Sequence, residues 1–216
     1  MALQTREQHI KREKATSNIC TAQALLATMA GFYAVYHGPE GIRTIAERIH
    51  SIAVFLEKSI NRLGYKQVNA QYFDTLRFAL PDTISAQQIR TIALSKEVNL
   101  RYFKNGDVGM SIDETTDITA VNVLLSIFAI AAGRDWEKTS DVPMASSISA
   151  EMKRQSAYLT HEVFNKYHTE TEMMRYIKRL DRKDISLAHS MISLGSCTMK
   201  LNAAAEMLPL SRPEFM

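Results

Sequence analysis

Apolar residues recur at three- and four-residue intervals between residues 42 and 63, and this periodic run limits the fold more than any other feature. The run consists of Ile42, Ile45, Ala46, Ile49, Ile52, Ala53, Leu56, Ile60 and Leu63, and Gly64 follows it. Residues at this spacing share one face of an α-helix, and glycine commonly follows a helix end. We therefore predict a helix of about six turns, whose apolar face needs a core to cover it.

A second helix is predicted before this one. Residues 19–36 are rich in Ala, Leu and Met and end at His37-Gly38-Pro39, where glycine and proline stop a helix. This composition favours a largely buried helix. The preceding residues 1–17 carry many charges and lack a wide apolar face, so they are expected to form a charged N-terminal surface segment.

Five further elements follow the long helix. Residues 75–80 alternate apolar and polar as a strand does, and Ser85 to Gln88 has the spacing of a capping box that opens a helix. Residues 100–104 and 108–112 flank Asn105-Gly106-Asp107, which predicts a β-hairpin. Thr115 or Thr116 is expected to cap an apolar helix that ends at Gly133.

The resulting order β-α-β-β-α predicts an α+β domain over residues 18–133, with one antiparallel-rich sheet covered by helices on one face. Charges, Pro143 and several serines interrupt the apolar pattern over residues 134–156, which we interpret as a linker. Residues 157–216 contain a second capping box, Thr169 to Glu172, before a short helix. We expect this last part to be less ordered or helical.

The composition excludes several classes of protein. The chain has 216 residues, 46% of them hydrophobic, so it is long enough to bury a core. Its 26 basic and 23 acidic residues give a net charge of +3, too little for a dedicated nucleic-acid binder. Cys20 and Cys197 lie far apart and form no zinc motif. Such isolated cysteines favour a cytosol-like reducing compartment. No signal sequence or membrane span is seen.

The densest group of reactive side chains occupies residues 195–202, Gly-Ser-Cys-Thr-Met-Lys-Leu-Asn. Backbone N–H groups near Gly195, the hydroxyls of Ser196 and Thr198, and the charge of Lys200 form a set that can hold a carboxylate or phosphate. A polar turn before a helix starting near Asn202 explains the same residues. Lys200 is likewise either a Schiff-base lysine or a solvated one.

Two other candidate sites have equally simple structural explanations. Thr16, Ser17 and Asn18 precede a helix, where they either bind an anion or only cap the helix. His161 and His168 lie seven residues apart, but no acidic or cysteine partner completes a metal site with them. We expect no metal.

Four stretches together resemble the P-protein family of glycine decarboxylases. They are residues 2–10, residues 14–23, residues 33–41 and residues 193–202, which contain Ser-Leu-Gly-Ser-Cys-Thr-Met-Lys-Leu-Asn. The resemblance covers essentially the whole chain. It implies an aminotransferase-like, type I pyridoxal-phosphate fold built from two related halves. This chain would then be an internal piece: the small domain of the first half, a bridge, and the start of the second half.

The resemblance also implies an activity and partners. Such enzymes are oxidoreductases that decarboxylate glycine with pyridoxal phosphate as the electron sink and pass the aminomethyl group to the lipoyl arm of H-protein. The lysine that binds the cofactor in this family lies beyond residue 216, so Lys200 is not that lysine. Ser196, Thr198, Lys200 and Asn202 would line the cofactor cleft, and Thr16, Ser17 and Asn18 would face the same cleft or its counterpart.

This resemblance predicts that the piece alone is inactive and binds no cofactor covalently. Apolar faces that normally meet the remaining domains would favour a homo-oligomer. The location would be the cytoplasm, or the mitochondrial matrix in a eukaryote. Two other hypotheses remain open at this point: a stand-alone α+β dimerisation or binding module without catalysis, and nucleic-acid binding through the basic opening segment, which would be strongly salt-dependent.

Overall fold

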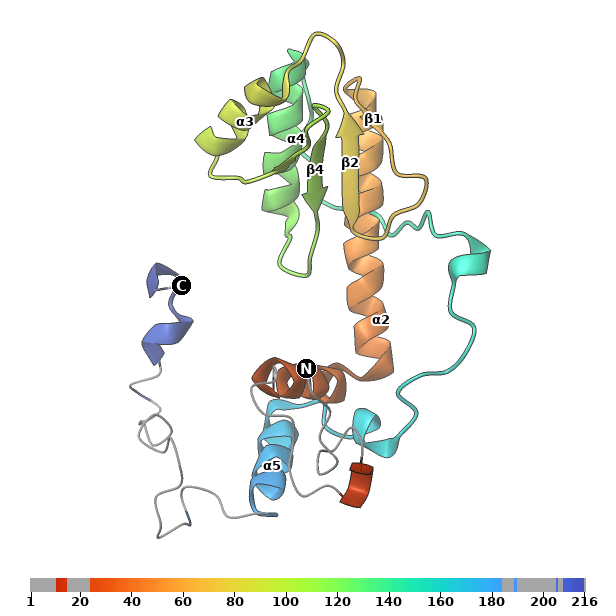
Figure 1. The fold of residues 1–216 in the computed structure, drawn as a ribbon, viewed down its shortest axis with the longest axis vertical. Helices are drawn as coiled ribbons and strands as arrows, with labels where there is room; N and C mark the ends of the chain where they lie inside the picture. Colours follow the sequence, from red (N-terminus) through yellow and green to blue (C-terminus); the bar gives the residue numbers. More distant parts are fainter. Residues whose placement is uncertain (1–10, 15–23, 184–188, 190–204, 206–207, 216) are drawn as a thin grey trace. The chain divides into compact units, whose positions relative to one another are not determined.

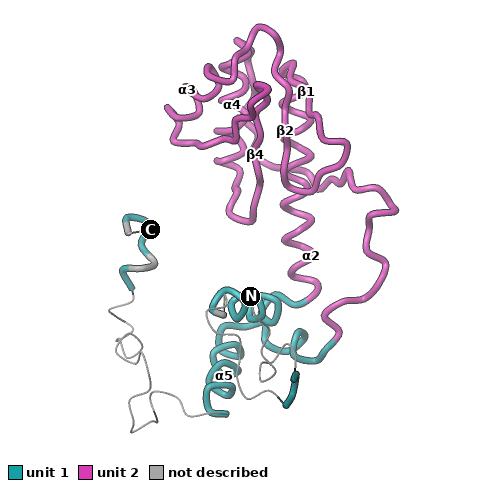
Figure 2. Tube along the Cα trace, in the orientation of Figure 1, with its two compact units in different colours: residues 1–38, 161–216 teal, residues 39–160 magenta. Residues whose placement is uncertain are grey.

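The structure is a computed structural model that describes residues 11–14, 24–183, 189, 205 and 208–215. The chain divides into two compact units (Figure 2). Unit 1 comprises residues 1–38 and 161–216, and unit 2 comprises residues 39–160. The longest helix, α2 (Ala24–Arg62), runs through the boundary, where Gly38 has φ 62° and ψ −176° and interrupts the helical backbone. The predicted break at residues 37–39 is confirmed.

Unit 2 has the predicted order of elements (Figure 1). After the second part of α2, they are β1 (Lys66–Gln67), β2 (Thr75–Ala79), α3 (Ala86–Ser95), β3 (Arg101–Tyr102), β4 (Val108–Ser111), α4 (Ile118–Ala132) and the short helix η2 (Ala150–Met152). The strand β1 was not foreseen, because two residues are too few to produce an alternating pattern. The α+β fold class with an antiparallel sheet is confirmed.

The four strands form one antiparallel sheet in the order β1-β2-β4-β3. Leu76 pairs with Met110 and Phe78 pairs with Val108, so these four side chains lie on the same face. Arg77, between them in β2, pairs with Gly109 and lies on the opposite face. This register puts one apolar row against the helices.

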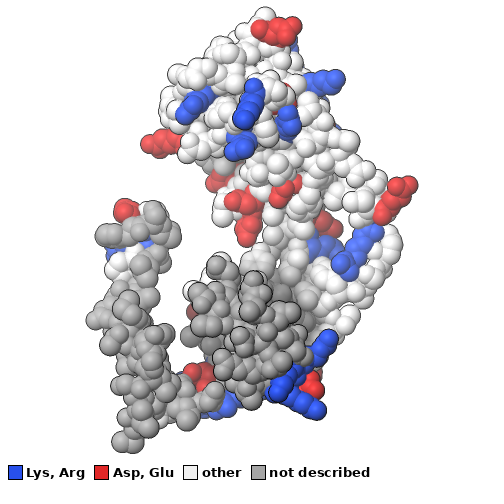
Figure 3. Space-filling model, in the orientation of Figure 1, with Lys and Arg blue, Asp and Glu red and all other residues white. Residues whose placement is uncertain are grey.

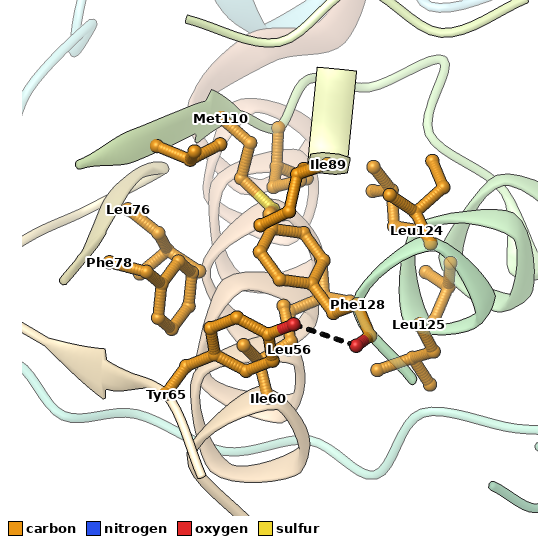
Figure 4. Packing of buried hydrophobic residues seen from close by; sticks show 14 of the residues in the cluster. Leu56, Ile60, Tyr65, Leu76, Phe78, Ile89, Met110, Leu124, Leu125 and Phe128 are labelled. Carbon is orange, nitrogen blue, oxygen red and sulfur yellow. Dashed lines mark hydrogen bonds between the residues drawn. The ribbon is translucent and has the colours of Figure 1, made fainter. Parts of the chain in front are cut away.

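The core of unit 2 lies between that row and the helices α2, α3 and α4 (Figure 4). Leu56 and Ile60 from α2, Ile89 from α3 and Phe128 from α4 are fully buried there. The Tyr65 hydroxyl donates a hydrogen bond of 2.8 Å to the Phe128 carbonyl, and the two rings meet edge to face at 5.0 Å. Burying each such apolar side chain contributes about 1.5 to 3 kcal/mol, so this cluster dominates the stability of unit 2.

The helix ends of unit 2 follow the sequence signals with one exception. The Ser85 hydroxyl accepts the Gln88 N–H at the start of α3, and Gly133 ends α4 with a left-handed φ of 60°. The N-cap of α4 is Asp117, which accepts the Ala120 N–H at 2.8 Å, so the prediction of Thr115 or Thr116 is wrong. Both threonine hydroxyls instead donate to the Asp113 carboxylate, which lowers the pKa of Asp113.

The second face of the sheet carries an ion pair beside an aromatic ring. Arg77 Nε donates to Asp107 Oδ2 at 2.6 Å, and the guanidinium lies 4.3 Å from the centroid of the Phe103 ring. That ring covers Gly109, where an added Cβ would lie 2.9 Å from Phe103 Cε2. In Figure 3, Lys and Arg side chains gather over α3 and the sheet, whereas Asp and Glu side chains gather near the loop between β4 and α4.

Unit 1 contains the first part of α2 together with η1 (Arg12–Lys14), η3 (Glu162–Asn165), α5 (Glu170–Asp181), η5 (Leu208–Ser211) and η6 (Pro213–Phe215). The predicted capping box of α5 is confirmed, because the Thr169 hydroxyl accepts the Glu172 N–H. The Tyr176 ring of α5 meets Phe32 of α2 edge to face at 6.2 Å and stacks on Tyr167 at 4.3 Å. These ring contacts join α5 to the first part of α2.

Gly38 is needed in unit 1 for two reasons. Its φ of 62° is a conformation that side chains other than glycine rarely adopt, and a Cβ there would lie 2.7 Å from the Phe164 carbonyl oxygen. The neighbouring His168 donates from Nδ1 to the Tyr36 carbonyl at 2.7 Å. A carbonyl left free where the helix breaks thereby gains a partner.

The prediction that residues 19–36 form a largely buried helix is wrong for the residues described. Leu25 is 73% exposed, Leu26 59% and Met29 57%. The sequence indicated correctly that this helix has an apolar surface, but unit 1 as described does not provide enough chain to cover it.

The two units divide the chain at different positions from the expected domain boundaries. Residues 134–156, interpreted as a linker, contain no element except η2, and unit 2 includes all of them. The expected division into residues 18–133, 134–156 and 157–216 concerns the longer protein and stays a prediction. Within the described part of the chain, no helix is both long enough and apolar enough to span a membrane.

Candidate functional site

The residues proposed for cofactor or anion binding from the sequence are not placed by the structure. Ser196, Thr198, Lys200 and Asn202 lie outside the described residues, as do Thr16, Ser17 and Asn18. The assignments to these positions stay predictions. The described residues instead show a hollow and a polar network in unit 2, both formed where residues 139–148 cross α2.

The hollow has a volume of about 510 Å³ and lies between α2, the start of α4 and residues 140–144. Its polar groups include Thr44 and Arg48 from α2, Asp117 from α4, and Ser140 and Asp141 from the crossing segment. The apolar part of its wall includes Ile52, Val121 and Val142. The mixture of one cation, two carboxylates and hydroxyls allows hydrogen bonding but does not favour an anion.

The guanidinium of Arg48 already donates hydrogen bonds to the backbone of unit 2. Its Nη1 donates to the Glu114 carbonyl at 3.0 Å and its Nη2 to the Thr116 carbonyl at 3.1 Å. The planar guanidinium suits two such acceptors side by side. Arg48 thus fixes the loop before α4 to α2, and this hollow has no uncommitted cation aimed into it.

Residues 145–147 are held on α2 by two adjacent side chains, His50 and Ser51. The Ser51 hydroxyl accepts the Ala145 N–H at 3.1 Å and lies 2.7 Å from the Glu47 carbonyl. His50 Nε2 accepts the Ser147 N–H at 3.0 Å, while Nδ1 donates to the Phe73 carbonyl at 2.8 Å. These partners require the neutral tautomer with its proton on Nδ1.

Tyr72 completes this polar network. Its hydroxyl donates to Glu57 Oε2 at 2.8 Å, and its ring lies 5.8 Å from that of His50. Burial raises the pKa of Tyr72 to about 12; a hydrogen bond with Ser147 lowers it, and the hydrogen bond and charge of Glu57 raise it. The phenol therefore stays protonated near neutral pH and acts as a donor, not as a base.

The chemistry available in the hollow is limited by the residues that line it. None of its lining residues is a lysine or a cysteine, so it offers no amine for a Schiff base and no thiol nucleophile. No group of three His, Cys, Asp or Glu side chains suited to a metal ion occurs among the residues that the structure describes. A covalently held carbonyl cofactor does not fit this hollow, and we interpret the hollow and network as scaffold.

His50 and Ser51 were not foreseen from the sequence. Both lie inside the strongest predicted helix, next to the apolar positions 49, 52 and 53, and both are 2% exposed. Two polar residues beside an apolar face require hydrogen-bond partners when they are buried. That requirement could have indicated that another segment crosses α2 at this point.

Comparison with known proteins gives consistent matches. The family model described as glycine cleavage system P-protein matches residues 1–128. A glycine dehydrogenase (decarboxylating) of Bacteroides fragilis (strain YCH46) is 84% identical over all 216 residues, and that of Bacteroides thetaiotaomicron is 82% identical. The aligned region is 23% of the length of each relative. The corresponding protein of Flavobacterium johnsoniae is 54% identical over 215 residues, 22% of its length.

A solved structure gives a weaker match. The crystal structure of a glycine decarboxylase (P-protein) of the glycine cleavage system, in inhibitor-bound form, aligns with a TM-score of 0.47 and 24% identity, over 60% of this chain and 31% of that chain. A score this low does not establish a shared fold. The family model, however, matches more than half of the chain. The chain therefore belongs to the glycine cleavage system P-protein family.

Proposed function

We propose that this chain is a section of a P-protein that decarboxylates glycine and transfers the remaining aminomethyl group to the lipoyl arm of H-protein. The observation that carries the proposal is the 84% identity along all 216 residues to a protein named glycine dehydrogenase (decarboxylating). The chain spans about a quarter of the length of that relative. The activity therefore belongs to the longer protein.

In this proposal, unit 2 is the small domain of the first half of an aminotransferase-like, type I pyridoxal-phosphate fold. Its antiparallel sheet with three helices packed on one apolar face supports such a role. Residues 134–156 bridge to the second half, whose beginning is residues 157–216. The hydrogen bonds of His50 and Ser51 to residues 145–147 would then hold the middle of the bridge on the small domain.

The cofactor of the longer protein is pyridoxal phosphate, which supplies an electron sink when bound. We assign Ser196, Thr198, Lys200 and Asn202 to the cleft that orients cofactor or substrate, and Thr16, Ser17 and Asn18 to an anion-binding helix start. The lysine that binds the cofactor is proposed to lie outside these 216 residues. This section alone is accordingly proposed to be inactive.

The proposed partners are the remainder of the P-protein, lipoylated H-protein and glycine, and the protein is proposed to be a homo-oligomer in the cytoplasm. Neither nucleic acid nor a membrane is a proposed partner. The net charge of +3 supports the exclusion of nucleic acid, because a nucleic-acid binder needs an extended field of one sign.

Borohydride trapping tests whether this section binds the cofactor by itself. The purified chain is titrated with pyridoxal phosphate, reduced with borohydride and mapped by mass spectrometry, with Lys200→Arg and Lys138→Arg as matched variants. We expect scattered labelling well below one equivalent, the same in both variants. Stoichiometric labelling that only Lys200→Arg abolishes would overturn the assignment of Lys200 to a non-covalent role.

A further inference from the structure

Unit 1 lacks a core of its own in the part that the structure describes. Among its described residues, the buried apolar side chains are Val35 of α2 and Met173 of α5. Unit 2, by contrast, buries a continuous cluster of apolar side chains from α2, α3 and α4 and from both central strands. Among the described residues of unit 1, internal packing therefore leaves apolar surface exposed.

The exposed apolar residues of the first part of α2 lie on one face. Leu25, Met29 and Tyr36 follow each other at four- and seven-residue spacing, and Leu26 borders them. Their exposed fractions are 73%, 57% and 38%, and that of Leu26 is 59%. We call these four residues the α2 stripe. Phe32 lies on the same face, three residues after Met29 and four before Tyr36, and its ring contacts Tyr176 of α5, so α5 covers part of this face and leaves the α2 stripe exposed.

The second α-helix of unit 1, α5, also exposes apolar side chains. In α5, Met174 is 63% exposed and Ile177 is 40% exposed, although Met173 beside them is buried. Soluble proteins seldom expose apolar surface in such groups unless another surface covers it. A helix also derives most of its stability from the packing of its apolar face. Another surface is therefore needed to cover the α2 stripe.

The length of the relatives indicates which surface covers the α2 stripe. All 216 residues align with proteins in which they make up only 23% of the chain, so more than three quarters of those polypeptides lies outside the aligned region. On the basis of the proposed function, we infer that the α2 stripe is a docking surface for an apolar face of the remainder of the same P-protein polypeptide. A second copy of this chain is the competing occupant.

Methionine oxidation tests this inference without mutation, since the rate of oxidation follows exposure of the thioether. Dilute hydrogen peroxide is applied to the 216-residue chain and to the full-length P-protein, and each methionine is followed by peptide mass spectrometry. Met29 and Met174 are the probes, and Met110, 6% exposed in the core of unit 2, is the internal reference for folding. Glycine–bicarbonate exchange is measured on the same full-length sample.

We expect Met29 to oxidise on the order of ten times more slowly in the full-length protein than in the 216-residue chain, with Met110 slow in both. Equal rates for Met29 in an exchange-active full-length protein would overturn the inference and leave the proposed function intact. Loss of exchange activity would count against the proposed function itself. Protection of Met29 that rises with the concentration of the 216-residue chain would show a second copy as the occupant and overturn the inference.

Discussion

The imidazole of His50 connects the backbone of Phe73 to that of Ser147. Nδ1 donates to the Phe73 carbonyl at 2.8 Å, and Nε2 accepts the Ser147 N–H at 3.0 Å. The ring also stacks on that of Phe73, with the two planes 3° apart. A single side chain of α2 therefore satisfies two backbone groups from segments that are distant in the sequence, and it is 2% exposed while doing so.

Replacing this imidazole should destabilise unit 2. His50→Ala leaves one carbonyl and one N–H without partners and removes a buried ring, so we expect a loss of about 2 to 4 kcal/mol in the free energy of unfolding. Urea unfolding followed by circular dichroism measures this loss. Glu47→Ala, an exposed position one turn earlier, is the control and should change stability by less than about 0.5 kcal/mol. Equal effects of the two variants would contradict the role assigned to His50.

Ser51 and His50 should act together, because both hold residues 145–147. Ser51→Ala leaves the Ala145 N–H without its acceptor, and we expect it to cost about 1 to 2 kcal/mol. Once either side chain has been removed, the segment is partly released and the second removal costs less. A double-mutant cycle should therefore show coupling of at least about 0.5 kcal/mol. Strict additivity would mean that the two side chains hold residues 145–147 independently.

A side chain at Gly109 would collide with the ring of Phe103, so we predict that Gly109 tolerates alanine only when that ring is removed. A Cβ there would lie 2.9 Å from Phe103 Cε2 and 3.3 Å from the Leu76 carbonyl oxygen. We expect Gly109→Ala to destabilise the protein by about 1 to 3 kcal/mol. In the background of Phe103→Ala the same change should be much less costly. Chemical denaturation of the four proteins tests this, and an unchanged cost in that background would show that Phe103 is not the obstacle.

Much of unit 2 was predictable from the sequence, because its signals are local. The spacing of apolar residues gave the helix over residues 42–63, the alternation gave β2, and Ser85 and Gly133 gave helix ends. The N-cap of α4 was misplaced because Thr115, Thr116 and Asp117 are all good capping residues, and only the structure shows that Asp113 engages both threonines.

The contacts of the polar network could not be predicted in the same way. Ser51 and Ala145 are 94 residues apart, and nothing in the local pattern of residues 134–156 indicates that their backbone crosses α2. The exposure of the α2 stripe was also missed, because an apolar helix looks the same in sequence whether its covering surface lies inside or outside the chain. For the cofactor-site residues the sequence is the sole source, since they lie outside the described residues.

Two tyrosine-to-phenylalanine changes should have opposite effects. Tyr65 donates to the Phe128 carbonyl, so Tyr65→Phe removes a buried hydrogen bond and should cost about 1 kcal/mol. In the described part of the chain, the Tyr102 hydroxyl is buried without a hydrogen-bond partner, so Tyr102→Phe should be neutral or stabilising by up to about 1 kcal/mol. Thermal and urea unfolding of both variants check the contrast. Destabilisation of equal size would contradict it.

Tyr65 should also make stability depend on pH in the alkaline range. Burial raises the pKa of Tyr65 from 10.0 to about 12, so the folded protein retains a proton that the unfolded chain releases. Its contribution is fully present below pH 10 and is lost as the pH rises towards 12, an effect of about 2 to 3 kcal/mol. Unfolding free energies measured from pH 9 to 12 should fall less steeply for Tyr65→Phe than for the unaltered chain. Parallel curves would exclude this contribution.

Glycine–bicarbonate exchange, in the presence of lipoylated H-protein and pyridoxal phosphate, tests whether the activity belongs to the longer protein and not to this section alone. It is made with the 216-residue chain and with the full-length P-protein to which the chain belongs. We predict exchange by the full-length protein and none by the chain, because the lysine that binds the cofactor is proposed to lie outside these 216 residues. Exchange catalysed by the 216-residue chain alone would contradict it.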